Sequence, residues 1–495
     1  MPPFSFDNSY SRLPEQFYRH CSPATAPQPS LIRFNEALAK DLGIAAAEIS
    51  EEALTHWFSG NQLPGGAEPI ATVYAGHQFG GFNPQLGDGR AILLGEVVDV
   101  RGQRQDIQLK GAGRTPYSRG GDGRSPLGPV LREYLVSEAM HALGVPATRA
   151  LAAVTTGETV FRDQPLPGAI LTRVAASHIR VGTFQFFAAR RDYEALRTLA
   201  DHVIERHYPQ AAVSANPYLA LLQGVIERQA SLVAQWMSIG FVHGVMNTDN
   251  VSVSGETIDF GPCAFLDVYD PATVFSSIDT GGRYAYQMQP AIAQWNMARF
   301  AETLLPLLSA DEESAVTLAT DQVKAFVPLY QKAWLARMRV KLGLLSDHAD
   351  DEVLIERLLT AMTKNRVDFT RLFRYLCDAL SDPLQEDHCR KLFASASDWD
   401  NWAASWQQRL SLLQEQEAGG RELRRQKMRS HNPAVIPRNH RIERCIQNAV
   451  ERQDFSDFHR LATIFSSPYE DHPEEQDWLG PPPPSESVCT TFCGT

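Results

Sequence analysis

The first third of the chain carries short β patterns of apolar and polar residues, separated by turn residues. They predict strands at 90–100, 104–111, 150–161 and 168–175. Between the second and third of these, the segment PVLREYLVSEAMHALG at 129–144 has the apolar spacing of a helix. Strands with one inserted helix predict a small mixed lobe in this part of the chain.

From about residue 185 the pattern becomes helical. The segments 192–208 and 216–240 carry apolar residues at i, i+3, i+4 and i+7, the spacing of one helix face. Asn216 followed by Pro217 predicts the start of the second helix, because Asn caps helix N-termini and Pro is favoured at the first helical position. Further helices are predicted at 291–308, 312–342, 351–379 and 398–416, with another helical unit at 433–465.

At 495 residues the chain is too long for one compact core, so we expect an α+β protein divided into lobes. The expected parts are an N-terminal extension at 1–70, a β-rich N-lobe at 71–180, a helical C-lobe at 181–400 and a helical extension at 401–495. The first part contains predicted helices near 31–42 and 47–59. The acidic, Pro-containing tail from about residue 470 is expected to be mobile.

The composition argues against several classes of protein. A formal net charge of −12 disfavours nucleic acid as the main partner, because a phosphate backbone requires a basic surface. No apolar run approaches the ~18 residues of a membrane span, and the N-terminus has no signal or transit pattern. Seven scattered cysteines do not make a secreted disulfide framework. We therefore expect a cytoplasmic protein in a reducing compartment, and a monomer.

Glycine is concentrated in residues 74–123, which hold 12 of the 33 glycines and mark close approaches of the backbone. In the segment QLGDGR, Gly87 and Gly89 precede a predicted strand and let backbone N–H groups approach phosphate oxygens. Arg90 adds a charged fork to the same turn. A tight turn before a strand is the simpler interpretation of these residues when they are considered alone.

Two further polar groups of residues are candidate phosphate contacts. Asp122 and Gly123 lie in the loop 114–128, whose Gly-Gly-Asp-Gly run resembles a backbone cradle or, equally, a flexible surface loop. Arg173 and Arg180 flank the junction between the expected lobes. Two such arginines can clamp phosphates bidentately, or they can form a structural salt bridge between the lobes.

Lys110 and Glu133 have the order and spacing of a kinase-type pair. Lys110 ends the predicted strand DIQLK, and Glu133 lies on the inserted helix. A Lys–Glu pair from strand and helix orients the Lys amine toward nucleotide phosphates. Either residue alone is more often an exposed surface side chain, but the sequence order of glycine turn, strand Lys and helix Glu favours the pair.

Residues 241–265 have the layout of a kinase-like catalytic loop, a small hairpin and a second loop. Asn250 and Asp259, the latter in an Asp-Phe-Gly triplet, offer the oxygen ligands that suit Mg²⁺. Val245 stands where the kinase catalytic loop has its Asp, so the usual phosphotransfer base is absent. Asp249 is free to orient or deprotonate an attacking hydroxyl, whereas His243 is expected to support the loop. Zinc is not expected, because no CxxC pair or HExxH motif occurs.

Five blocks of sequence closely resemble the selenoprotein O (SelO/YdiU) family. They are YAGHQFGGFNPQLGDGRA, QLKGAGRTPYSRGGDGRSPLGPVLREYL, HGVMNTDN, DFGPCAFLD and NPAVIPRNHRIE. The resemblance runs from about residue 70 to residue 470. It implies a protein-kinase-like two-lobe fold that binds ATP in an orientation flipped relative to kinases. It also implies transfer of AMP, rather than phosphate, to Ser, Thr or Tyr hydroxyls of target proteins, with Mg²⁺ or Mn²⁺.

The resemblance also assigns roles to matching positions. Asp249 becomes the catalytic base, while Asn250 and Asp259 hold the metal ion. The implied ATP contacts are Gly87, Gly89, Arg90, Lys110, Asp122, Gly123, Arg173, Arg180 and Asp259. Spacing and resemblance agree for Lys110, Glu133, Asn250 and Asp259, whereas AMP transfer follows from the resemblance alone.

Relatives in this family differ at the C-terminus, where some carry a selenocysteine and some pair a C-terminal thiol with a cysteine of the activation segment. Here Cys489 and Cys493 stand near the end of the chain, and Cys263 follows the Asp-Phe-Gly triplet. A disulfide from Cys263 to either one would restrict the loop, and three ordinary thiols are an equal alternative.

Two other functions are compatible with these residues. An atypical kinase would transfer the γ-phosphate, for example to a small molecule, and a non-catalytic pseudokinase would bind nucleotide and act as a scaffold.

Overall fold

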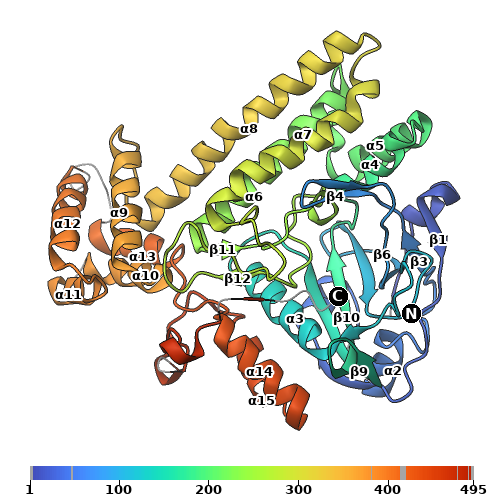
Figure 1. The fold of residues 1–495 in the computed structure, drawn as a ribbon, viewed down its shortest axis with the longest axis horizontal. Coiled ribbons are helices and arrows are strands. Elements are labelled where there is room, and N and C mark those ends of the chain that lie inside the picture. The colour runs from blue at the N-terminus through green and yellow to red at the C-terminus, as the bar shows by residue number, and fades with distance from the viewer. Residues whose placement is uncertain are drawn as a thin grey trace.

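The computed structural model describes residues 4–45, 48–380, 382–412, 420–475, 478–488 and 490–491. It is a mixed α+β structure with one main antiparallel sheet in the first part of the chain and helices in the rest (Figure 1). The sheet has the order β1 (Tyr18–His20), β3 (Ile70–Thr72), β6 (Ala91–Val98), β7 (Arg104–Lys110), β10 (Pro165–Ala175), β9 (Arg149–Phe161) and β2 (Ser30–Phe34). The short β8 (Ser125–Pro126) pairs with β10.

The sheet is covered on both faces, because successive residues of a strand point to opposite sides. In β6, Ile92 and Leu94 share a core with Phe58 of α2 (Glu51–Phe58), beside α1 (Glu36–Asp41). Leu93, between them, belongs to the second core together with Leu131 of α3 (Leu127–Ala142). The four strands predicted from residue 90 onward and the inserted helix are therefore confirmed as β6, β7, β9, β10 and α3.

The helical part begins with α4 (Val181–Ala189) and α5 (Tyr193–His207) and continues with α6 (Pro217–Ile239), α7 (Gln289–Leu308) and α8 (Glu312–Lys341). The predicted cap of α6 is confirmed, since the Asn216 side chain accepts a hydrogen bond from Leu219 N at 3.1 Å. The helix ends at Gly240, which has a left-handed φ of 73°. α6, α7 and α8 pack side by side, and α8 extends well beyond the sheet (Figure 1).

The last part of the chain is a series of shorter helices: α9 (Asp351–Asn365), α10 (Phe369–Ala379), α11 (Pro383–Lys391), α12 (Ala396–Ser411), α13 (Gly420–Arg429), α14 (Asn439–Arg452) and α15 (Ser456–Ile464). α14 and α15 return to pack against α3 (Figure 1). Arg132 of α3 donates to Asn439 Oδ1 at 2.7 Å and also pairs with Glu443, both on α14. The same Arg132 donates to the carbonyl of Cys263 at 3.1 Å.

Two predicted helices are corrected by the structure. The segment 31–42 is not one helix, because Ser30–Phe34 forms β2 and pairs with β9, and only Glu36–Asp41 is helical. Tertiary pairing overrides the local pattern there, and Asn35 caps the helix by accepting from Leu38 N. The segment 351–379 is two helices, because Arg366 ends α9 with a left-handed φ of 53°.

Several helical details were missed or displaced. Two helices, α11 and α13, were not predicted as separate elements. The helix predicted at 398–416 runs over Ala396–Ser411, and the end of the predicted range, 413–416, lies outside the described residues. None of the helices that the structure describes is both long and apolar enough to cross a membrane.

Candidate active site

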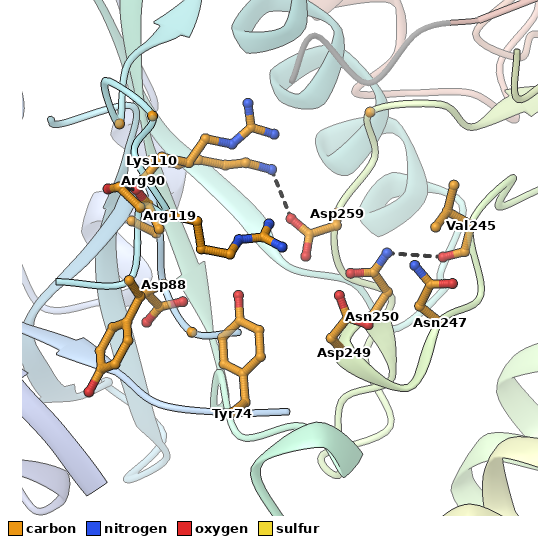
Figure 2. Close-up of a pocket in the computed structure, with 18 of the residues that line it drawn as sticks. Tyr74, Asp88, Arg90, Lys110, Arg119, Val245, Asn247, Asp249, Asn250 and Asp259 are labelled. Atoms are coloured by element: carbon orange, nitrogen blue, oxygen red, sulfur yellow. Dashed lines mark hydrogen bonds and ion pairs between the residues drawn. The ribbon is translucent and has the colours of Figure 1, made fainter. Parts of the chain in front are cut away.

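A cavity of about 700 Å³ lies where the sheet meets the loops that follow α6 (Figure 2). Its walls come from the glycine turn 87–91, the loop 117–124, the ends of β7 and β10, and residues 245–262. All the predicted nucleotide, metal and base residues line this one cavity. Cys263 does not line it, although its neighbours Gly261 and Pro262 do.

Lys110 and Glu133 are in direct contact. Lys110 is the last residue of β7, where it lies opposite Ala91 of β6 and Leu171 of β10. Its Nζ donates to Glu133 Oε1 of α3 at 2.6 Å and to Asp259 Oδ1 at 2.8 Å. The Lys side chain is nearly buried and is held by both carboxylates. Figure 2 shows its contact with Asp259.

Asp259 collects positive charge. Arg173 of β10 contacts Oδ1 at 2.7 Å, and Arg180, at the start of α4, contacts Oδ2 at 3.3 Å. Burial alone would raise the pKa of Asp259, but Lys110, Arg173 and Arg180 hold it well below its ordinary value. Asp259 also has a left-handed φ of 64°, an uncommon conformation for a non-glycine residue. Strained backbone conformations such as that of Asp259 cluster at functional sites. Here the strained residue is also an ionised carboxylate in contact with three cations.

Asp249 lies in the turn Thr248–Asn250 (η5), which directly precedes the short bridge between Val251 and Thr257. The residue is buried, and burial raises the pKa of its carboxyl to about 6. Gln78 donates to Oδ2 at 3.0 Å, while Oδ1 has no hydrogen-bond partner among the described residues. Arg180 donates to the main-chain carbonyl of Asp249 at 2.7 Å, so one arginine connects this residue to Asp259.

Asn250 is oriented by its own loop. Its Nδ2 donates to the carbonyl of Val245 at 3.0 Å, which turns the side-chain oxygen toward Asp259 (Figure 2). An amide oxygen beside a carboxylate fits Mg²⁺, which takes few protein ligands and completes its shell with phosphates and water. Within the described residues there is no cluster of His, Cys, Asp and Glu that would hold a metal ion without such help.

His243 supports the loop, as expected. Its ring Nε2 donates to the carbonyl of Ile258 at 2.9 Å, and its backbone N donates to Gln289 Oε1 at 2.9 Å. The buried ring has a lowered pKa because burial disfavours the charged form. His243 thereby connects the loop before Asp249 to the segment that carries Asp259.

The glycine turn needs its glycines for packing. A Cβ on Gly87, which has a φ of 122°, would lie 2.5 Å from the Tyr117 ring, and one on Gly89 would lie 3.0 Å from the Tyr117 carbonyl. The turn therefore sits directly on the loop that contains Tyr117, with Arg90 at the cavity wall. The tight-turn interpretation and the phosphate-cradle interpretation are compatible at this position.

The second glycine-rich loop is held by side chains. Arg162 contacts Asp122 at 2.8 Å. Its hydrogen bond lowers the pKa of the Asp122 carboxyl and outweighs burial, which raises it. A Cβ on Gly123, which has a φ of 68°, would lie 2.0 Å from the Gly113 carbonyl. Asp122 is thus placed at the cavity in an ion pair, and Gly123 allows two backbone segments to touch.

Several cavity residues were not predicted. Tyr74 points its hydroxyl into the cavity (Figure 2). The guanidinium of Arg180 lies 4.6 Å from the centre of the Tyr74 ring. Asp88 stands between the predicted Gly87 and Gly89, and its Oδ2 accepts from Thr72 Oγ1 at 2.7 Å. The position of Asp88 in the glycine motif was a usable signal. The remaining unpredicted polar residues of the wall include Gln78, Ser118, Arg119, Arg124, Arg162 and Asn247.

Cys263 is buried behind the cavity, with its Sγ 3.1 Å from the Phe260 carbonyl. Cys489 and Cys493 lie outside the described residues, so a disulfide to Cys263 stays a prediction. Thr491 is described and buried: its N donates to Phe275 O at 2.7 Å, and its hydroxyl donates to Pro262 O. This part of the tail therefore lies against the segment that carries Cys263.

Comparison with known proteins identifies the family. The family model described as "Protein adenylyltransferase SelO" matches residues 3–466. The protein nucleotidyltransferase YdiU of Rhizobium meliloti (strain 1021) is 56% identical over 495 residues, covering 100% of both chains. The proteins of the same name from Rhizobium etli and Rhodopseudomonas palustris (strain BisB5) are each 56% identical over 492 residues, covering 99% of this chain and 97% and 99% of theirs. The chain therefore belongs to the SelO family of protein adenylyltransferases and is a nucleotidyltransferase.

Proposed function

We propose that this enzyme transfers AMP from ATP to the hydroxyl of a Ser, Thr or Tyr residue in a target protein. The observation that carries the proposal is the pairing of a kinase-type Lys110–Glu133–Asp259 constellation with Asp249, in a loop that has Val245 where a kinase has its base. Family membership supports the nucleotidyl transfer, since the matching model is that of a protein adenylyltransferase.

The proposed architecture is a protein-kinase-like arrangement of a β-rich N-lobe and a helical C-lobe, with ATP in the cavity. Its support is the position of α3 against β9 and β10, which brings Glu133 to Lys110, and the position of the Asn250 and Asp259 loops across the cavity. We further propose that ATP binds in the orientation opposite to that in kinases, so that the α-phosphorus faces Asp249.

The cations of the cavity would bind the phosphates. Lys110, Arg173 and Arg180 all donate hydrogen bonds to Asp259. Their donor groups therefore already face one point of the cavity, beside which phosphate oxygens would lie. Arg90, Gly87 and Gly89 would meet another phosphate from the glycine turn, and Asp122 and Gly123 would contribute from the second loop. Such donors are fixed before the nucleotide arrives and need little reorganisation when charge develops.

Asn250 and Asp259 would hold Mg²⁺ or Mn²⁺. When bound, the ion would neutralise phosphate charge, which is the usual role of the metal in nucleotide chemistry. The residues fit this role because the Asn250 oxygen faces Asp259 and because Asp259 Oδ2 carries just one weak contact, with Arg180, among the described residues.

Asp249 would accept the proton of the attacking hydroxyl. The hydroxyl oxygen forms a bond to the α-phosphorus, and the bond from that phosphorus to the bridging oxygen breaks, which releases pyrophosphate. The proton passes from the hydroxyl to the Asp249 carboxylate. Arg180 contacts both the Asp249 main chain and the Asp259 carboxylate. It would therefore hold the proposed base at a fixed position relative to the phosphate site.

Labelled ATP tests the proposal directly. The protein is incubated with target protein extract and ATP labelled at the α or the γ position. The masses of the intact protein products are also measured by mass spectrometry. Label from the α position alone, with an added AMP mass, is expected. Label from the γ position alone would instead identify a kinase, and no label from either position would favour a nucleotide-binding scaffold. The matched control is Asp249→Asn, which keeps the side-chain shape and removes the base.

A further inference from the structure

A small hairpin from the first part of the chain covers the loop that contains Asp249. Its strands are β4 (Gly76–Gln78) and β5 (Gly81–Asn83), joined through Phe79, which has a left-handed φ of 51°. The hairpin does not pair with the main sheet but contacts α4 and the turn Thr248–Asn250. Nothing in the proposed chemistry above uses it.

Consecutive residues of the hairpin bind consecutive residues of the loop. The backbone N of His77 donates to Thr248 Oγ1 at 2.7 Å, and Gln78 Nε2 donates to Asp249 Oδ2 at 3.0 Å. The backbone N of Phe79 donates to Asn247 Oδ1 at 3.0 Å. Two of these bonds start from the hairpin backbone, whereas the bond to Asp249 depends on a side chain.

The hairpin also restricts Asp249 by shape. A Cβ on Gly76 would lie 2.6 Å from Asp249 Oδ1 and 3.0 Å from its Cγ, so the carboxylate rests directly on the glycine backbone. Oδ1 has no polar partner there. Among the described residues, Gln78 is the side chain that donates a hydrogen bond to this carboxylate.

We propose that Gln78 is a positioning residue, which fixes the rotation of the Asp249 carboxylate so that it faces the incoming hydroxyl. This inference rests on the proposed function, in which Asp249 is the base. Gly76 limits where the carboxylate can lie, and Gln78 selects its orientation there by holding Oδ2. Without the amide, the carboxylate can rotate about its Cβ–Cγ bond on the bare backbone of Gly76.

The hairpin has anchors that do not involve Gln78. Thr248 Oγ1 donates to Gln185 Oε1 at 2.6 Å, and Gln185 Nε2 donates to His77 Nδ1 at 2.9 Å. The Tyr284 hydroxyl donates to Asn247 Oδ1 at 2.6 Å, on the same acceptor as Phe79 N. A change confined to the Gln78 amide should therefore leave the hairpin docked.

The test compares Gln78→Met, which keeps length and removes the donor, with Gln103→Met in the exposed turn between β6 and β7. AMP transfer from α-labelled ATP gives kcat and KM, and thermal unfolding reports stability. For Gln78→Met we expect kcat to fall roughly tenfold or more, with the KM for ATP and the Tm unchanged. The control should match the parent protein. An unchanged kcat, or a rise in KM with kcat preserved, would overturn the proposal.

A second comparison separates positioning from general packing. In an Asp249→Asn background, Gln78→Met should cause no further loss of the residual rate, because the residue acts through the missing carboxylate. An equal fractional loss in both backgrounds would contradict the inference. If Gln78→Met unfolds, Gln78→Asn, whose amide is one methylene too short to reach Oδ2, is measured in the same way.

A crystal structure of Gln78→Met keeps this inference separate from the proposed function. If the parent protein transfers no AMP, the proposed function fails, but the orientation of the Asp249 carboxylate can still be compared. A rotated or multiply oriented carboxylate supports positioning by Gln78. An unchanged orientation of the Asp249 carboxylate would contradict the inference.

Discussion

Lys110 Nζ lies 2.8 Å from Asp259 Oδ1, so the last residue of a sheet strand is joined to the loop that follows α6. Arg173 and Arg180 contact the same carboxylate. This contact connects the β-rich and helical parts of the chain at the cavity. The Asp259 carboxylate is thus bound by three cationic side chains from the sheet and from the start of α4.

Asp259→Asn should abolish AMP transfer and destabilise the protein. The substitution leaves Lys110, Arg173 and Arg180 buried with less negative charge, and breaking such a buried pair costs about 3–5 kcal/mol. Activity should fall by roughly 100-fold or more, since the site also loses its proposed metal ligand. Denaturant unfolding and α-label transfer measure the two effects, with Asp321→Asn on the exposed face of α8 as control. Retained full turnover would sink the metal assignment.

Glu133→Gln should impair the use of ATP with little change in fold. Lys110 keeps its contact with Asp259 but loses the charged partner that holds it from α3. A hydrogen bond to a charged group contributes about 1.5–3 kcal/mol, so kcat/KM should fall roughly tenfold or more. Steady-state kinetics in ATP measure this, and Glu194→Gln on the surface of α5 is the matched control. Equal kinetics for both variants would show that the pair has no role.

Tyr74→Phe should weaken nucleotide binding without lowering stability. The hydroxyl points into the cavity and has no hydrogen-bond partner among the described residues, so its removal leaves no protein group unsatisfied. The ring, stacked under Arg180, is retained. One lost neutral hydrogen bond is worth about 0.5–1.5 kcal/mol, or a roughly two- to tenfold rise in Kd. Calorimetric titration with ATP measures it, and an unchanged Kd would place the hydroxyl outside the bound nucleotide.

Lys341→Met should stabilise the protein in a pH-dependent way. Lys341 is buried between Phe369 and Phe373, has no carboxylate within ion-pair distance in the described part of the chain, and burial lowers its pKa from 10.5 to about 7. The unfolded chain therefore binds the proton more tightly, so stability rises with pH between about 7 and 10.5.

The gain from Lys341→Met should consequently be largest at or below pH 7 and fade toward pH 10. Its size should be on the order of 1–3 kcal/mol, because cation–π contact with the rings offsets part of the burial penalty. Thermal unfolding at several pH values measures the gain. The exposed Lys324→Met on α8 should show no such trend, and a pH-independent Tm difference for Lys341→Met would refute the lowered pKa.

Reductant should change the activity if Cys263 pairs with Cys489 or Cys493. A disulfide would restrict the segment after Asp259, so transfer should be slower without dithiothreitol and recover with it. Peptide mass spectrometry identifies the bridge, and Cys263→Ser should remove the effect. Equal rates in both conditions, with no bridged peptide, would eliminate the hypothesis.

The parts of the site that depend on local pattern were predictable from the sequence. Lys110 at a strand end and Glu133 on the inserted helix follow from periodicity, and their contact follows from packing that helix on the sheet. The Asn216 cap of α6 is equally local. Each of these features involves one helix or strand, or two that are neighbours. The residues that predict it lie within a few dozen positions of one another.

The contacts between distant segments were not predictable in the same way. Nothing local indicates that the hairpin with Gln78 binds Asp249, because the two are separated by 171 residues and joined by one side chain. Arg173 and Arg180 were expected to hold phosphate or an interlobe salt bridge, and the sequence left open which acidic residue they meet. The strand Ser30–Phe34 was missed for a similar reason, since its pairing with β9 is decided by the assembled sheet.

The contacts of Arg132 bear on the order in which the protein matures. This residue adjoins Glu133 on α3, yet its guanidinium is bound by Asn439 and Glu443 of α14, more than three hundred residues later. During synthesis from the N-terminus, α3 is made early but gains its final clamp only after α14 has left the ribosome. The helix that carries Glu133 of the cavity is therefore fixed against α14 only late in synthesis, and a chain terminated before residue 439 would lack these contacts of Arg132.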